Sequence, residues 1–189
     1  MKVKRAYRYE LDPNVRQRIL LAKHAGAARF AYNWGLARRI ELYQQTGKST
    51  NAIEQHRELN RLKKTEYPWL YEVSKCAPQE ALRDLDRAFQ NFFRGLQEGR
   101  KVGFPRFRKK GRDDRFRLTG AIRVVGRAVQ LPRLGLIRPS RAASCRRLEA
   151  RSRRSRSMWV LCRIDISQLR MLPLLLNVDR RSKARIRAS

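Results

Sequence analysis

"ALRDLDRAFQNFFRG", residues 81–95, gives the clearest indication of the fold class. Its apolar residues recur every three to four positions, which predicts one amphipathic helix with a buried stripe. Pro78 favours a helix start nearby, and Gly95 and Gly99 favour its end. The stripe is typical of a helix that packs on a core, and it consists of Leu82, Leu85, Phe89, Phe92, Phe93 and Leu96.

The segment before this helix also predicts helices. Asp12 is the expected N-cap of the first, with Pro13 in its first turn, and Gly26 is the expected break before a second helix over 29–43. Gly47 is a natural stop for that second helix.

A third helix is indicated before the helix of residues 81–95. Asn51 and Glu54 have the spacing of a capping box, which opens a helix that extends to about Lys64. The stretch 66–70, "EYPWL", is expected to form a turn that carries an aromatic plug.

Alternating patterns flank the helical block on both sides. Residues 2–11 place apolar side chains on one face and mostly basic ones on the other, which predicts a strand. Residues 121–131 predict a hairpin that turns at Gly126 and Arg127, and residues 131–138 extend it. The sequence therefore predicts an α+β fold in which a helical domain is inserted into a small antiparallel β-domain.

The net charge of the chain limits the classes of partner that it is expected to bind. The 46 Lys and Arg against 16 Asp and Glu give a net charge of +30 over 189 residues, so a polyanion is the expected partner. Nucleic acid is the first candidate and an anionic membrane the second. The N-terminus lacks the apolar region of a signal peptide, and no apolar run is long enough to span a membrane. The three cysteines form no CxxC pair.

Cations and aromatic rings alternate in "GFPRFRKKGRDDRFR", residues 103–117. Cations bind phosphates, and exposed rings stack on bases, so this loop is a candidate nucleic-acid surface. Phe104 and Phe107 have two interpretations: each either stacks on a base or plugs the loop onto the helical core. Asp113 and Asp114 are expected to temper the charge of the loop.

Catalytic signals are lacking in the sequence. It contains no GxSxG, HExxH or P-loop motif, and its acidic residues show no pattern that would bring them together. We therefore predict no catalytic residue in this chain.

The order of these motifs resembles the N-terminal half of the TnpB/OrfB family, transposon-encoded RNA-guided DNA endonucleases long described as transposases with an N-terminal helix-turn-helix. The resemblance covers about residues 1–138 and rests on the ordered stretches 28–48, 67–75, 81–95, 103–117 and 129–138. It implies a wedge-like β-barrel with an inserted helical recognition domain. It also implies a guide RNA and a DNA target with an adjacent short motif as partners, and neither a membrane nor a small-molecule substrate.

By position, the residues that read the DNA motif in this family fall near Asn51, Ala52, His56, Lys75, Gln79 and Thr119. Ala52 and His56 depart from the polar pattern expected there. The full set of expected nucleic-acid contacts is Lys4, Arg8, Arg29, Asn33, Lys75, Gln79, Arg106, Arg108, Lys109, Lys110, Arg112, Arg115, Arg117 and Thr119.

The chain also departs from the family pattern. The family cuts DNA with a RuvC-like domain, which would hold Mg²⁺, and carries a later zinc ribbon; this sequence stops before both. We therefore expect no metal or other cofactor here, no cleavage by the chain alone, and an incomplete barrel. A frameshift after about Arg138 is our hypothesis for the Arg/Ser-rich texture that follows.

The expected organisation has seven parts. They are a first barrel strand (1–11), a helix-turn-helix-like recognition domain (12–98), the basic aromatic loop (99–118), a hairpin with its following strand (119–138), an Arg/Ser-rich segment (139–157), a further strand (158–170) and a tail (171–189). The expected location is the cytoplasm of a bacterium or archaeon, at the nucleoid. The alternative is a small basic nucleoid- or RNA-binding protein without nuclease ancestry.

Overall fold

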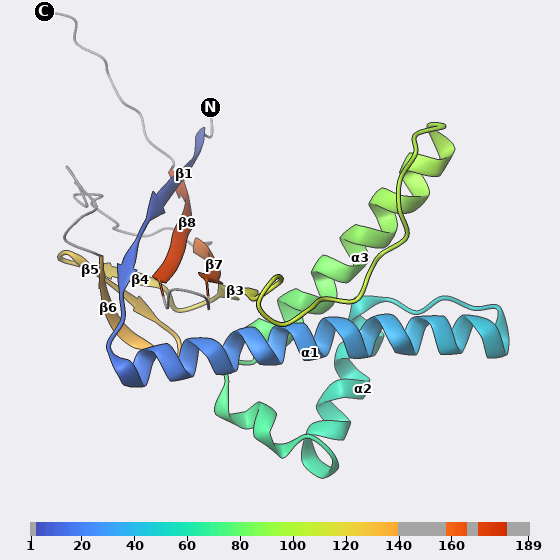
Figure 1. The fold of residues 1–189 in the computed structure, drawn as a ribbon, viewed down its shortest axis with the longest axis horizontal. Helices are drawn as coiled ribbons and strands as arrows, with labels where there is room; N and C mark the ends of the chain where they lie inside the picture. Colours follow the sequence, from blue (N-terminus) through green and yellow to red (C-terminus); the bar gives the residue numbers. More distant parts are fainter. Residues whose placement is uncertain (1–2, 140–157, 166–169, 181–189) are drawn as a thin grey trace, which may run out of the picture.

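The computed structural model describes residues 3–139, 158–165 and 170–180, and it has an α+β fold (Figure 1). The predicted order of strand, helices and sheet is confirmed. The elements are β1 (Val3–Tyr9), β2 (Leu11–Asp12), α1 (Val15–Thr46), α2 (Ala52–Thr65), the 3-10 helix η1 (Pro68–Glu72), α3 (Cys76–Gln97), β3 (Arg115–Thr119), β4 (Arg123–Val125), β5 (Ala128–Leu131), β6 (Gly135–Pro139), β7 (Met158–Asp165) and β8 (Arg170–Arg180).

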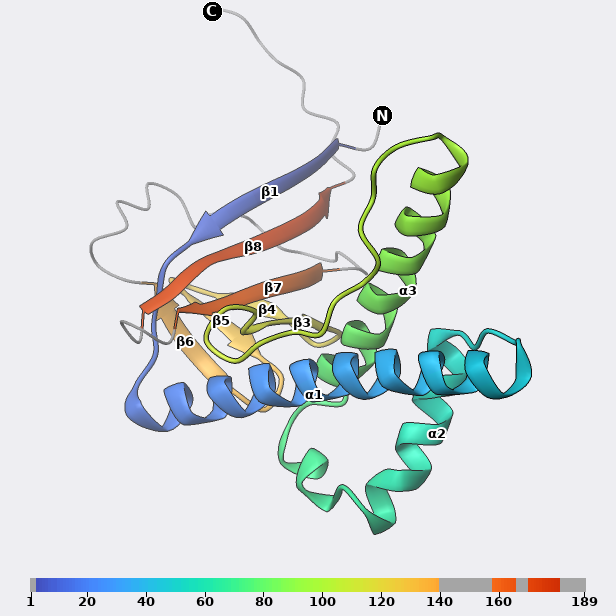
Figure 2. The ribbon, with the colours of Figure 1, turned by 45° about the vertical axis from the view of Figure 1, so that its right-hand side comes forward.

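The strands form two open antiparallel sheets of four strands each (Figure 2). One sheet has the order β1-β8-β7-β3, and the other has the order β2-β6-β5-β4. In the part of the chain that is described, neither sheet closes on itself, so the barrel and its wedge-like shape stay predictions. The three α-helices lie in the chain between β2 and β3, so the predicted insertion into a β-domain is confirmed.

The strand predictions are confirmed with one correction. Val125 pairs with Ala128, so β4 and β5 turn at Gly126 and Arg127 as expected. A strand is present at 158–165, as predicted, but the segment expected to be a tail contains β8, which pairs with both β1 and β7. Residues 140–157 lie outside the described residues, so the Arg/Ser-rich segment and the frameshift hypothesis stay predictions.

The first helix begins two residues later than predicted. Asn14, not Asp12, is its N-cap: the Asn14 side chain accepts from the Gln17 N–H at 2.9 Å, and the Gln17 side chain accepts from the Asn14 N–H at 3.0 Å. Asp12 instead pairs with Arg138 across β2 and β6. The Gln17 amide also donates to the carbonyl of Leu136 at 2.8 Å, which ties the start of α1 to β6.

The predicted break at Gly26 is wrong, because α1 runs through it without interruption. A glycine inside a helix costs about 1 kcal/mol relative to alanine. The neighbouring residues Ala25, Ala27 and Ala28 are buried, and this packing outweighs that cost. Gly47 ends the helix in a left-handed conformation, as predicted.

The capping box of the next helix is confirmed. The Asn51 side chain accepts from the N–H groups of Ile53 and Glu54, both at 2.9 Å, and α2 follows. The aromatic stretch after α2 forms η1, in which Leu70 is fully buried and Trp69 is 41% exposed. The plug of this turn is therefore the leucine.

Helices α1 and α3 approach closely at Gly35. A Cβ added there would lie 2.6 Å from a methyl carbon of Leu82 and 3.1 Å from one of Leu85. Both leucines are fully buried. The stripe of α3 is core only in this inner half, because α3 diverges from α1 (Figure 1), and Phe93 and Leu96 are each 54% exposed. Our expectation of a stripe that is core throughout is corrected accordingly.

His24 joins α1 to the segment that follows η1. Its side chain is fully buried. The Ser74 N–H donates to Nε2 at 3.0 Å, so Nε2 carries no proton and Nδ1 donates to the Leu20 carbonyl at 2.7 Å. Burial lowers the pKa of His24, and the charge of Arg133 lowers it further, against the raising effect of the Leu20 bond.

We expect acid to destabilise the fold through His24. Its folded pKa lies below the unfolded value of about 6.5, so below that pH the unfolded chain takes up a proton that the folded chain refuses. The free energy of unfolding should fall by up to about 1.4 kcal/mol between pH 7.5 and 5.5. Urea denaturation at both pH values measures this fall.

A non-titrating variant isolates this effect. His24→Gln retains an amide that can donate to Leu20 and accept from Ser74, so it should show a smaller fall. His56→Gln measures the contribution of the other histidine of the chain, whose pKa is also lowered, so that the two contributions are separated. An equal fall in wild type and His24→Gln would contradict the assignment.

Candidate nucleic-acid interface

The loop between α3 and β3 returns along α3 toward α1 (Figures 1 and 2). At its outer end Val102 lies where a Cβ on Gly95 would be, so Gly95 permits this close return. Phe104 meets Phe89 and Phe92 edge to face, with ring centroids 5.4 Å apart in each case. Phe104 therefore packs the loop onto the helical core, which is the second of the two interpretations, although 47% of it is exposed.

The middle of the loop is fixed to α1 by Asn33 and Arg108. The Asn33 amide donates to the Arg108 carbonyl at 3.0 Å, and its oxygen accepts from the Arg108 N–H at 2.8 Å. The Arg108 guanidinium lies 3.8 Å from the Tyr32 ring centroid and 3.6 Å from a carboxylate oxygen of Asp84. Arg108 is 9% exposed, and this burial lowers its pKa. Asn33 and Arg108, which were both predicted to contact nucleic acid, thus hold the loop in place, and Arg108 is turned away from solvent.

The far end of the loop is fixed by its acidic residues. Asp114 is buried, forms an ion pair with Arg29, and accepts from the Gly111 N–H at 2.7 Å. Asp113 accepts from the Lys109 N–H at 3.1 Å. The two aspartates do more than temper charge, because they shape the loop backbone, and Arg29 is engaged within the protein.

Four of the predicted cations remain on the surface of this fixed loop. All are exposed, and none has an acidic partner among the described residues; they are Arg106, Lys109, Lys110 and Arg112. We call them the loop cations. Because their backbone is anchored while their charges are free, the loop presents a positive surface that loses little conformational entropy on binding.

The predicted residues of β3 are turned partly inward. Arg117 lies 3.5 Å from Asp84 and 3.9 Å from Glu80, so its charge is partly compensated within the protein. Arg115 is half-buried. The Thr119 carbonyl accepts from the Cys76 thiol at 3.3 Å, which joins β3 to the start of α3.

Lys4 and Arg8 lie four positions apart on β1. In the register of β1 with β8, Lys4 is opposite Asp179 and Arg8 is opposite Leu175. Lys4 and Arg8 belong to this sheet and not to the loop. The predicted nucleic-acid contacts are therefore divided between two parts of the fold.

A second group of cations lies around α2 and consists of Lys63, Lys75 and Arg133, of which the sequence analysis named Lys75 but missed the other two. Lys63 is 7% exposed, and its ammonium lies 5.3 Å from the Tyr71 ring centroid. Burial lowers the pKa of Lys63, and Arg133 and Lys75 lower it further. Burial also lowers the pKa of His56, followed by neighbouring cations with Lys63 first. No ion pair of the described residues involves Lys63. Local pattern could not reveal this group, because its members come from distant parts of the chain.

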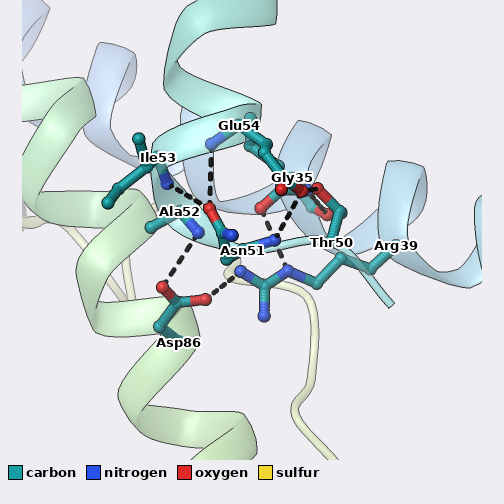
Figure 3. Close-up of polar contacts among 9 residues, drawn as sticks. Gly35, Arg39, Thr50, Asn51, Ala52, Ile53, Glu54 and Asp86 are labelled. Atoms are coloured by element: carbon teal, nitrogen blue, oxygen red, sulfur yellow. Dashed lines mark hydrogen bonds and ion pairs between the residues drawn. The ribbon is translucent and has the colours of Figure 1, made fainter. Parts of the chain in front are cut away.

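Some of the residues predicted to read the DNA motif lie in this second group of cations or beside it, and others lie in the core. Lys75 is exposed and Gln79 is half-exposed beside it. In contrast, Asn51 is occupied as the cap of α2, and the buried Ala52 donates its N–H to Asp86 at 2.9 Å (Figure 3).

Figure 3 shows the junction that holds α2 against α1 and α3. Arg39 forms an ion pair with Asp86 and donates from Nε to the Gln55 side chain at 3.0 Å. Gln55 in turn donates to the Gly35 carbonyl at 2.7 Å. This network is interior and positions α2, and so positions the second group of cations.

Comparison with known proteins identifies the family. Residues 1–48 match a family model described as a helix-turn-helix domain, that of OrfB of the IS605 type. Within those residues the structure has β1, β2 and one unbroken helix, α1. None of the helices in the described ranges has the length and apolar character of a membrane span.

Curated relatives extend the match. The chain is 33% identical over 141 residues to InsQ of Escherichia coli, which covers 73% of this chain and 34% of InsQ. It is 34% identical over 155 residues to a protein of Mycobacterium tuberculosis, covering 70% and 33%, and 34% identical over 114 residues to one of Streptomyces pristinaespiralis, covering 59% and 27%. All three are named as RNA-guided DNA endonucleases, and the chain spans about a third of their length. These matches, together with the helix-turn-helix family model of its first 48 residues, support this chain as a member of the TnpB/OrfB family that corresponds to the N-terminal part of its relatives.

Proposed function

We propose that this chain is a nucleic-acid-binding part of a TnpB-type RNA-guided DNA endonuclease. The observation that carries the proposal is the set of loop cations, which are exposed, lack acidic partners among the described residues, and stand on an anchored backbone. Such a surface binds phosphates and releases counterions. The names of the relatives support a guide RNA and a DNA target as the partners.

The second group of cations supports a separate contact with the duplex beside the target. The charges of Arg133 and Lys75 lie close enough to Lys63 to lower the pKa of its ammonium, which burial lowers first. A DNA phosphate would relieve that repulsion, and the amide of Gln79 is suited to a base edge. Binding to DNA would place the protein at the nucleoid.

The two sheets support the proposed wedge-like barrel. One residue, Glu10, separates β1 from β2, and residues 120–122 separate β3 from β4. Each pair consists of one edge strand from each sheet. Short links therefore join the two sheets at both edges, which is the connectivity that a barrel of eight strands requires.

Among the described residues, no three His, Cys, Asp or Glu side chains gather where they could hold an ion. The part of the chain that the structure describes therefore does not fit the Mg²⁺ and Zn²⁺ that the family implies.

A binding assay on the purified chain tests the proposed function. A labelled RNA hairpin transcribed from the chain's own locus is compared by fluorescence anisotropy with an unstructured RNA of equal length and with duplex DNA, over a salt series. We expect salt-dependent binding, with at least about tenfold preference for the locus RNA. Equal affinity for every probe would favour the alternative of a general basic nucleic-acid-binding protein, and no binding at low salt would overturn the proposal.

A further inference from the structure

A hollow of about 540 Å³ lies on the outer face of α1, beside the loop. Gly26 and Ala37 line it together with the larger side chains Phe30, Trp34 and Phe107. The volume lies within the range of small-ligand sites in proteins.

The hollow reaches the surface of α1 because two of its lining residues there, Gly26 and Ala37, are small. Nothing lies within 4 Å of the position that a Cβ on Gly26 would take, so this part of α1 is open to solvent. One wall is held by its own neighbours, since Phe30 meets Tyr67 and Trp69 edge to face at centroid distances of 4.8 and 5.1 Å. The glycine that does not break the helix therefore makes room on its surface.

Phe107 is the residue that the loop contributes to the lining of the hollow. It is 53% exposed, although the next residue, Arg108, is buried and doubly bonded to Asn33. Its backbone is thus fixed while its ring is not covered. A ring held in this way is a preorganised stacking surface, because little freedom is lost when a planar ligand binds.

The charge around the hollow identifies its occupant. Arg106 precedes Phe107, and Lys109 and Lys110 follow within three positions; all three are exposed and lack acidic partners among the described residues. A stacking ring flanked by free cations is the arrangement by which proteins hold single-stranded nucleic acid. A base in a duplex is already stacked on both faces and could not enter.

We infer that this hollow is a nucleobase pocket, in which one unpaired base of a single strand stacks on Phe107 while the adjoining phosphates contact Arg106, Lys109 and Lys110. The inference rests on the proposed nucleic-acid binding and specifies the form of its substrate.

Two variants test the proposed pocket, one by removing a side chain and the other by adding one. Phe107→Ala removes the ring, and Gly26→Leu fills the floor, where open space accommodates the new side chain. Phe104→Ala is the matched control, because Phe104 is a similarly exposed ring of the same loop that lies on Phe89 and Phe92 instead. Circular dichroism and thermal melting check that each variant is folded.

The probes are a labelled 15-nucleotide oligouridylate, the corresponding oligothymidylate, and an abasic strand of the same length, at one salt concentration. Wild type should bind the strands with bases more tightly than the abasic strand. Phe107→Ala and Gly26→Leu should each weaken binding of the strands with bases about 5- to 150-fold and leave the abasic strand unchanged, since one stacked base is lost. Phe104→Ala should match wild type.

The outcomes separate the pocket from the proposed function. Wild-type affinity of both variants for all strands, or an equal loss in Phe104→Ala, overturns the pocket while binding itself stands. Failure of wild type to bind any strand overturns both. A loss confined to the oligouridylate or to the oligothymidylate supports the pocket and identifies RNA or DNA as the source of the base.

Discussion

Replacing the four loop cations together by alanine should lower nucleic-acid affinity by about three powers of ten at 0.1 M salt. Each lost phosphate contact removes about 0.7–0.9 from the slope of log K against log salt, so four remove about 2.8–3.6. The plots of log K against log salt for wild type and variant meet at 1 M salt, where log salt is zero. At 0.1 M, one log unit lower, the two values of log K therefore differ by the change in slope, about 2.8–3.6. Anisotropy titrations of the variant over a salt series measure both quantities.

The variant deliberately spares Arg108. The sequence alone would have included this arginine, but it is buried against Tyr32, so its loss would disturb the loop and confuse the result. A control variant removes four other exposed cations, Arg16, Lys48, Arg123 and Arg127. Both variants have the same net charge, so an equal loss of slope in the control would mean that the loop is not on the nucleic acid.

Arg39→Ala should destabilise the fold by about 3–5 kcal/mol. The side chain of Arg39 is 6% exposed, and its removal leaves the carboxylate of Asp86 without its cation and the Gln55 oxygen without its donor. Removing one partner of a largely buried ion pair has this cost because the other charge, on the 27% exposed Asp86, stays mostly desolvated. The guanidinium also lies 5.0 Å from the Phe89 ring centroid, a contact that is lost with it. Urea denaturation followed by circular dichroism gives the change in unfolding free energy.

The adjacent arginine supplies the control for this prediction. Arg38 bonds Glu41 at 2.9 Å and Glu58 at 3.0 Å, but at the surface, so Arg38→Ala should cost less than about 1 kcal/mol. Adding Asp86→Ala to Arg39→Ala should cost less than the sum of the two single changes, because the unpaired charge is then gone. Similar costs for Arg38→Ala and Arg39→Ala would show that the junction in Figure 3 does not support the fold.

Local signals predicted the elements well where neighbouring residues decide the structure. The capping box of Asn51 and Glu54 is satisfied within four residues, and the turn at Gly126 and Arg127 needs no distant partner. The continuity of α1 through Gly26 could not be predicted, because burial of its neighbours against other elements outweighs the local cost of a glycine. For the same reason the exposed outer half of the α3 stripe was mistaken for core.

Periodicity, local capping, motif order and composition were enough to predict the α+β class, the inserted helical block, the resemblance to the TnpB/OrfB family and the strongly positive charge. Only the tertiary structure decided which cations are free to bind. Arg29 meets Asp114 across 85 positions, and Asn33 meets Arg108 across 75. Electrostatic and hydrogen-bond partners are chosen by distance in space, and the chain must be folded before that distance exists. The pocket beside Phe107 arises from the same long-range contacts.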